Sequence, residues 1–443
     1  MALGAFWGCF IAGRFPFMEK STRLVLERLG FDFVDLDGFT CCPEKSVIKN
    51  ESEINWLVTA ARNLAIAEEA GVDLFSPCNG CVGSLAGAAR ELALHRDLRE
   101  EVNRRLARVG RTYRGTVRVF HLLDLLHDEI GLDYLRKYVE LPLAGLRVAV
   151  HAGCHQSRPS VDVNSDDPLN PRKFDEIIEA LGAKSVDYET KLMCCGGTQN
   201  TAGLVEEGAK LTRDKLVELR EVGVDCLCVS CPACFMQYDI QQYGFRREGE
   251  QFETPVAYLM ELMALSMGVA VEELALDMHR VPIEGAARGW VECAQRVSGA
   301  LEGVDMVALR KCLECRACSE VCAAHRTDES YSAFDLMEAI VQGRVDEVLE
   351  HEHIWRCLEC YECHERCFQR FGMIEPMRAL KRLAIERGLA PKAILSGLEA
   401  FKKTGKLTKP SKAQRQKLGL PEVSDSGVEE LQAVLDKGKR HSA

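Results

Sequence analysis

Ten cysteines in the first 240 residues constrain this chain more than any other feature, because they form two sets with one internal order. Each set consists of a single cysteine, a vicinal pair and a C-x2-C pair. In both sets 35 residues separate the vicinal pair from the C-x2-C pair. The first set is Cys9, Cys41, Cys42, Cys78 and Cys81, and the second is Cys154, Cys194, Cys195, Cys231 and Cys234. Two copies of one spacing predict a duplicated metal site.

The size and composition of the chain argue against a disulfide scaffold. A chain of 443 residues, 47% of them hydrophobic, can bury sizeable cores and is expected to form two or three domains. Its 21 cysteines fall largely into vicinal and C-x2-C units, which are typical of metal or redox chemistry in a reducing compartment. The net charge of −11 argues against a general affinity for nucleic acid.

The amino-terminal stretch is apolar, but it has no basic residue before the apolar run and it contains Cys9. We therefore expect a buried strand over 5–11 and not a signal peptide. The apolar run 257–267 is interrupted by Glu261 and is shorter than the roughly 20 residues that a membrane helix needs. Together these features predict a cytoplasmic protein without a membrane span.

Predicted strands alternate with predicted helices in both copies, which is typical of parallel α/β folds. In the first copy we expect strands over 5–11, 31–36 and 72–76 and helices over 17–29 and 55–70. In the second copy we expect strands over 146–150, 185–188 and 224–229 and helices over 171–181 and 211–222. The charged stretch 84–140 is expected to be a helical cover. This repeat predicts two similar lobes, related by a pseudo-twofold axis that brings the two cysteine sites face to face.

A second kind of cysteine motif follows in the last third of the chain, where C-x2-C-x2-C-x3-C occurs twice. This is the bacterial ferredoxin spacing, in which the last cysteine of each run binds the cluster of the other run. One [4Fe–4S] cluster would then use Cys312, Cys315, Cys318 and Cys367, and the other Cys357, Cys360, Cys363 and Cys322. The proline that usually follows the fourth cysteine is replaced by Ala323 and Phe368, and the intervening residues look helical. Structural zinc is the alternative, but it needs only four thiolates.

These patterns predict duplicated α/β lobes with parallel sheets, followed by a mainly α-helical ferredoxin-like domain. We place the first lobe at 1–145, the second at 146–282, a linker at 283–300, the ferredoxin-like domain at 301–375 and a basic helical tail at 376–443. The lysines and arginines of the tail form either a solvated face or a docking surface for an acidic neighbouring subunit.

The two five-cysteine sets resemble the duplicated cysteine-rich (CCG) domains of the B subunit of heterodisulfide reductase. Residues from about 290 onward resemble its C subunit, here fused in the order B then C. The resemblance implies a non-cubane [4Fe–4S] cluster on each five-cysteine set and two cubane [4Fe–4S] clusters in the C-like part. Pro43 stands where the second set has Gly196, a departure that leaves every thiolate in place.

The resemblance also implies a function. The chain would be an oxidoreductase acting on a sulfur group, reducing the coenzyme M–coenzyme B heterodisulfide or a related thiol carrier between its two non-cubane clusters. Electrons would pass one at a time through the cubanes from a flavin-containing A subunit, itself fed by a hydrogenase or formate dehydrogenase, in methanogenesis with electron bifurcation. The alternative is an electron-relay subunit of a complex that oxidises hydroxy acids or reduces aromatic thioesters. The presence of all ten cysteines favours catalysis.

Several other residues have both a functional and a structural interpretation. His155 is a candidate proton donor to a leaving thiolate, with a structural hydrogen bond as the alternative, and His151 is a weaker candidate. The three remaining free cysteines are expected to be packing residues: Cys226, Cys228 and Cys293.

Two basic residues near the first set, Arg14 and Lys45, could meet an acidic substrate. Solvation at the surface is the simpler interpretation of each. No dinucleotide-binding fingerprint occurs in the sequence, so the chain is expected to depend on a partner for its electrons.

Overall fold

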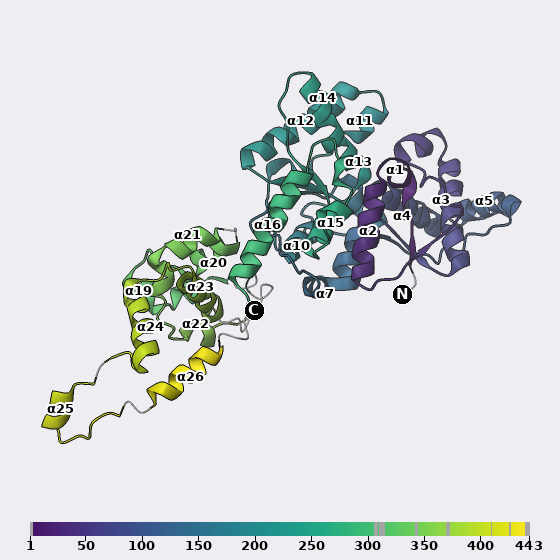
Figure 1. The fold of residues 1–443 in the computed structure, drawn as a ribbon. Coiled ribbons are helices and arrows are strands. Elements are labelled where there is room, and N and C mark those ends of the chain that lie inside the picture. Colours follow the sequence, from purple (N-terminus) through teal and green to yellow (C-terminus); the bar gives the residue numbers. More distant parts are fainter. Residues whose placement is uncertain are drawn as a thin grey trace. The chain divides into compact units, whose positions relative to one another are not determined.

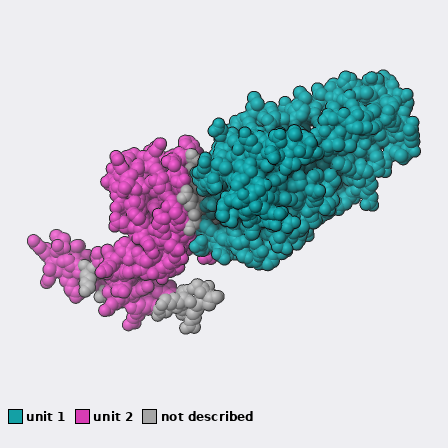
Figure 2. Space-filling model, turned by 90° about the horizontal axis from the view of Figure 1, so that it is seen from above, with its two compact units in different colours: residues 1–298 teal, residues 299–443 magenta. Residues whose placement is uncertain are grey.

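The computed structural model describes residues 3–304, 309, 315–341, 344–368, 373–408, 410–424 and 427–438. The chain divides into two compact units, residues 1–298 and 299–443, which are coloured separately in Figure 2. In the described ranges, no helix combines the length and the apolar character that crossing a lipid bilayer requires.

The first unit contains two four-stranded parallel sheets of identical topology. The first sheet has the order β2-β1-β3-β4, with β1 at Leu3–Ala5, β2 at Val34–Asp35, β3 at Asp73–Ser76 and β4 at Val119–His121. The second has the order β6-β5-β7-β8, with β5 at Arg147–His151, β6 at Lys184–Ser185, β7 at Cys226–Val229 and β8 at Val256–Tyr258. The predicted duplication of an α/β lobe with a parallel sheet is therefore confirmed.

Helices cover both sheets (Figure 1). In the first lobe they are α1 Gly8–Arg14, α2 Pro16–Arg28, α3 Glu53–Ala70, α4 Asn79–Leu94, α5 Arg96–Leu106, α6 Leu122–Asp124 and α7 Leu132–Lys137. In the second lobe they are α8 Cys154–Ser157, α9 Ser160–Val163, α10 Lys173–Ala180, α11 Gly197–Thr201, α12 Val205–Val222, α13 Pro232–Phe235, α14 Gln241–Arg247 and α15 Leu259–Ser266. The equivalent helices α3 and α12 both have 18 residues and end at a left-handed glycine, Gly71 or Gly223.

Two details of the pattern predicted for the first lobe were wrong. The first strand ends at Ala5, and Gly8, with φ +67°, turns the chain into α1 where a strand over 5–11 had been expected. The stretch 84–140 is not only a helical cover, because β4 adds a fourth strand to the sheet. Strands of three residues between charged segments carry too little alternation to be recognised in a sequence.

The two lobes pack closely within this unit. Helix α2 of the first lobe contacts α15 of the second (Figure 1). Helix α4 contacts α8 and α9. We call the interface between the two lobes the seam. Across it, the Asn79 amide donates a hydrogen bond to the carbonyl of Ala152 at 2.6 Å, and Lys45 pairs with Asp162 at 3.0 Å. One continuous cluster of buried hydrophobic side chains runs through both lobes. The lobes therefore share a core and are not independent domains.

The second unit consists of helices and connecting loops, with no strand among its described residues, as expected for the ferredoxin-like part. Its helices are α18 Ala317–Glu320, α19 Ala323–Thr327, α20 Ala333–Val341, α21 Val345–Glu350, α22 Glu362–Glu365, α23 Ile374–Glu386, α24 Lys392–Thr404, α25 Lys412–Lys417 and α26 Val428–Gly438. The stretch expected to be a linker is also helical, since α16 spans Glu284–Ala300.

Candidate functional site

The first five-cysteine set lies where the carboxyl ends of β1 and β3 open onto helices. Cys9 is in the first turn of α1, Cys78 is the residue before α4, and Cys81 is in the first turn of that helix. The vicinal pair Cys41–Cys42 lies in the loop after β2. Sites in parallel α/β sheets form at this edge, as the sequence predicted.

The second set repeats this placement. Cys154 begins α8 directly after β5, Cys231 precedes α13, and Cys234 lies within α13. The pair Cys194–Cys195 lies in the loop before α11. Each cysteine of the second set therefore occupies the structural position of its counterpart in the first.

Within each lobe the five sulfur atoms form one group. In the first, the sulfurs of Cys9 and Cys41 are 3.8 Å apart, and further thiol contacts join the other members in the order Cys41, Cys42, Cys81, Cys78. In the second, thiol contacts join the members in the order Cys154, Cys194, Cys195, Cys234, Cys231.

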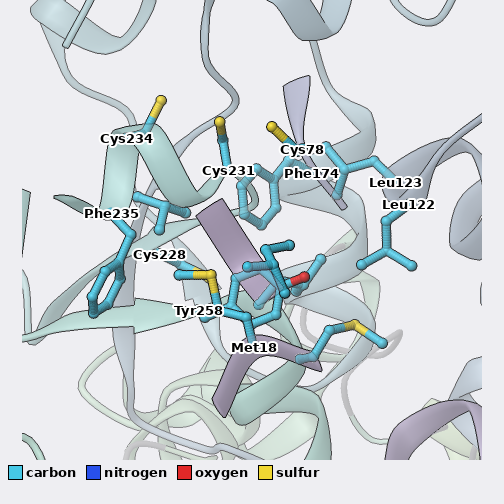
Figure 3. Close-up of a cluster of buried hydrophobic side chains, with 14 of the residues drawn as sticks. Met18, Cys78, Leu122, Leu123, Phe174, Cys228, Cys231, Cys234, Phe235 and Tyr258 are labelled. Carbon is cyan, nitrogen blue, oxygen red and sulfur yellow. The ribbon is translucent and has the colours of Figure 1, made fainter. Parts of the chain in front are cut away.

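The two groups meet at the seam between the lobes. The thiols of Cys78 and Cys231 lie close enough to shift each other's pKa, so the two groups are neighbours at the seam. Figure 3 shows the sulfur atoms of Cys78, Cys231 and Cys234 on one side of the core, whereas the Cys228 sulfur points away from them into the hydrophobic cluster. The sequence predicted that a pseudo-twofold axis brings the two sites face to face; the structure places Cys78 of one site next to Cys231 of the other.

The chemistry of the donors fits an iron–sulfur cluster at each set. Ten thiols converge without a carboxylate ligand among them, and soft thiolates are the donors that iron–sulfur clusters require. Hydrogen bonds from neighbouring thiols hold the pKa of Cys42 and that of Cys194 well below the ordinary thiol range, which favours the thiolate form that binds metal.

Glycines keep the space beside these sulfurs open. A Cβ atom at Gly8 would lie 2.7 Å from the Cys81 sulfur. A Cβ atom at Gly153, whose φ is +83°, would lie 3.5 Å from the Cys234 sulfur and 2.1 Å from the Asn79 amide nitrogen. Any larger residue at either position would displace a sulfur or the seam contact.

The two sets differ in exposure. Cys9 and Cys41 are exposed, and they line an open cavity of about 410 Å³ whose walls also include Trp7 and Phe39. In the second set the corresponding residues, Cys154 and Cys194, are half-buried. The C-x2-C pairs of both sets are buried at the seam.

Polar side chains surround the second set. A ring nitrogen of His151 lies within 4.8 Å of the Cys195 and Cys234 sulfurs. The Lys215 ammonium, fully buried, donates to the carbonyl oxygens of Thr190 and Lys191 and lies 3.4 Å from Nδ1 of His151. Burial lowers the pKa of Lys215 to about 7, against the opposing attraction of nearby sulfurs, and burial beside Lys215 holds the pKa of His151 well below its ordinary value.

Lys215 was missed in the sequence, where a lysine in a charged helix looks solvated. A signal was present, because Thr212, Leu216 and Leu219 of the same helix are buried and lie three residues before, one after and four after Lys215. At those spacings Lys215 belongs to the buried stripe of α12. A lysine in that position needs polar partners, and the loop before Cys194 supplies them.

The other candidate residues have defined places. His155 packs on the first lobe, since its Cβ would lie 3.3 Å from a Cβ at Gly83. Lys45 is used in the ion pair with Asp162, and Arg14 reaches the Met236 sulfur at 3.4 Å. Neither basic residue contacts a cysteine sulfur in these interactions.

The free cysteines outside the motifs are packing residues, as predicted. Cys226 and Cys228 are fully buried on β7. Cys293 lies in α16 and donates to the carbonyl of Ala144 at 3.7 Å.

In the second unit, four cysteines line one small pocket of about 30 Å³: Cys322, Cys357, Cys360 and Cys363. These are the members of one predicted interlocked set, drawn from both runs. Of the other set, Cys318 is buried, Cys315 is exposed and Cys367 is half-buried, whereas Cys312 lies outside the described residues.

Family models match both parts of the chain. A cysteine-rich domain model named CCG matches residues 3–86 and 148–239, and a 4Fe-4S dicluster domain model matches residues 308–371. Fold, cysteine placement and these matches together define an iron–sulfur protein built from a duplicated cysteine-rich domain and a dicluster domain.

Similar proteins identify the family within this class. The chain is 38% identical over 281 residues, 63% of its length and 93% of the relative, to the B subunit of the ferredoxin/F420H2-dependent CoB–CoM heterodisulfide reductase of Methanosarcina acetivorans. A protein of Archaeoglobus profundus that is named as similar to the C subunit of heterodisulfide reductase is 28% identical over 155 residues, 35% of this chain and 82% of that protein. The chain therefore belongs to the heterodisulfide reductase family and joins a B-like and a C-like region.

A third relative bears a different name. The membrane anchor subunit of the 8-methylmenaquinol:fumarate reductase of Wolinella succinogenes is 31% identical over 287 residues, which are 62% of this chain and 95% of that protein. The duplicated cysteine-rich region is thus shared with a protein whose name does not describe disulfide chemistry.

Proposed function

We propose that this chain is the B/C module of a heterodisulfide reductase and cleaves a disulfide at its paired five-cysteine sets. The observation that carries the proposal is that the two groups of five thiols are neighbours at the seam, where Cys78 and Cys231 shift each other's pKa. Reduction of R–S–S–R′ takes up two electrons and two protons and yields R–SH and R′–SH. Iron–sulfur clusters supply electrons singly, so two adjacent sites match the requirement.

The residues of the chain have separate tasks in this proposal. The two five-cysteine sets hold two non-cubane [4Fe–4S] clusters, and the interlocked runs of the second unit hold two cubane clusters. The shared core of the two lobes keeps the paired sites at a fixed separation. The exposed Cys9 and Cys41 and their cavity leave the first site accessible from solvent.

The electrons come from outside the chain. We propose a flavin-containing A subunit as the donor, supplied by a hydrogenase or formate dehydrogenase, in a cytoplasmic complex. The helices of the basic tail present exposed lysines that an acidic partner could contact, among them Lys402, Lys403 and Lys412. The coenzyme M–coenzyme B disulfide is the proposed substrate because two relatives, each 38% identical to this chain, are named for it.

His155 is the proposed proton donor to a departing thiolate, since it follows Cys154 and packs at the seam where both lobes meet. His155→Ala should slow thiol release by about 10²- to 10⁴-fold, the range for loss of a general acid, without loss of iron. Steady-state assays with and without added imidazole measure this effect, and imidazole should restore part of the rate. The matched control is His95→Ala, which removes an exposed histidine. Full turnover by His155→Ala would exclude the role.

The second candidate function is electron relay without disulfide chemistry. It is favoured by the 31% identity to the fumarate reductase subunit. In that case the same sites would pass electrons to a different active site in a larger oxidoreductase complex.

One anaerobic experiment separates the two functions. The purified protein is analysed for iron and sulfide, then mixed with a reduced viologen dye and coenzyme M–coenzyme B disulfide, and the released thiols are measured. About 16 irons per chain, four for each of four clusters, together with thiol release support the reductase. The same iron content without thiol release rejects the reductase and leaves the relay.

A further inference from the structure

The duplicated lobes place chemically different residues at equivalent positions around their sulfur sites. His151 lies three residues before Cys154, and Phe6 lies three before Cys9. Tyr238 lies four residues after Cys234, the last cysteine of the second set, and Leu85 lies four after Cys81, the last of the first set. Lys215 and Asn63 each lie eight residues before the glycine that ends their helix. All six side chains are buried.

From this difference we infer that the two five-cysteine sites have unequal reduction potentials, and that Lys215, with His151 and Tyr238, makes the second site the more easily reduced. The inference rests on the proposed function in one respect, namely that each set holds a cluster. It adds an order of reduction, with the second site filled before the first.

The pair Lys215 and Asn63 shows most clearly what the second lobe has gained. Asn63 donates to the carbonyl of Cys41 at 3.0 Å and accepts from the Thr40 amide, so it fixes the loop of the first vicinal pair. Lys215 fixes the corresponding loop by donating to the carbonyls of Thr190 and Lys191. Both residues do the same structural work, but only the lysine adds an ammonium group.

The other two positions add hydrogen-bond donors. Nε2 of His151 and the hydroxyl of Tyr238 are buried and have no hydrogen-bond partner among the described residues. The two rings contact each other edge to face, with centroids 5.0 Å apart, and a ring nitrogen of His151 is within 4.8 Å of two cluster cysteines. The counterparts Phe6 and Leu85 offer no polar atom. Unpaired donors beside a sulfur site are free to interact with whatever the site binds.

Charge and polarity determine which of the two sites has the higher reduction potential. A cluster that gains an electron becomes more negative, so nearby cations and hydrogen-bond donors stabilise its reduced form and raise its potential. Because Lys215 is fully buried, water and salt screen its charge little. The first site lacks these three groups and opens onto a cavity lined by Asp37, whose negative charge opposes reduction, and by Asp35, which is paired with Arg23.

The test is an anaerobic potentiometric titration of the full chain, monitored by electron paramagnetic resonance, for the wild type and for variants with full iron content. Lys215→Gln keeps a donor for the loop carbonyls but removes the charge. We expect the ratio of reduced to oxidised second site, at the wild-type midpoint, to fall about tenfold, which is 59 mV for a one-electron couple. Lys210→Met, which removes an exposed lysine from the same helix, should leave both midpoints unchanged.

A second variant guards against misfolding. Tyr238→Phe preserves the ring packing and removes only the hydroxyl, so we expect it to lower the midpoint of the second site as well. It provides the test if Lys215→Gln loses iron. The inference is overturned if the two sites of the wild type titrate together, or if both variants leave the midpoints unchanged. If the wild type shows two separate midpoints but releases no thiol, the proposed function is rejected and this inference stands. If it releases thiol but its two sites have the same midpoint, the proposed function stands and this inference is rejected.

Discussion

Cys195→Ala is expected to lower the iron content by about four atoms per chain, which is one [4Fe–4S] cluster, and to abolish thiol release. Cys195 is buried between Cys194 and Cys234, so its loss removes a central member of the second sulfur group. Iron analysis and the viologen-coupled thiol assay measure both effects. The control is Cys293→Ala, which removes a cysteine outside the motifs. Unchanged iron and thiol release would mean that the second set does not hold the proposed cluster.

Double variants in the second unit are expected to show which cysteines share a cluster. Cys322 lines one pocket with Cys357, Cys360 and Cys363, although it belongs to the other run. The variant Cys322→Ala with Cys363→Ala should therefore lose about four irons, no more than either single variant. The variant Cys322→Ala with Cys318→Ala should lose about eight, because it damages both clusters.

The opposite pattern, eight irons lost in the first double variant and four in the second, would show that each run binds its own cluster. Iron analysis of the single and double variants is sufficient, and low-temperature electron paramagnetic resonance identifies the cubane signal that disappears. A structural zinc site in place of either cluster would appear as zinc in the metal analysis and would leave no such signal.

The sequence predicted the fold where the pattern is long. Helices such as α3 and α12 carry a buried stripe and a terminal glycine, which gives the prediction two independent signals. The strands β4 and β8 have three residues each and no such signals. They are fixed by pairing with a neighbouring strand that is distant in the chain, and a local pattern cannot express that pairing.

The candidate site, too, could be predicted from the sequence only in part. The spacing of the cysteines was enough to group them, because each lobe repeats one order. The contact between Cys78 and Cys231 depends instead on how two lobes pack, which includes the hydrogen bond from Asn79 to Ala152. Lys215 was hidden for a related reason, since the partners of its ammonium lie in a loop more than twenty residues away.

The fusion of a B-like and a C-like region has a consequence for assembly. A tether holds the two regions at an effective concentration on the order of millimolar for a short linker, whatever the concentration of the protein. Separate polypeptides would dissociate on dilution below their Kd, and their stoichiometry would depend on their relative synthesis. In this chain, with α16 running through residues 284–300, the C-like region accompanies the B-like region at a fixed one-to-one ratio at any dilution.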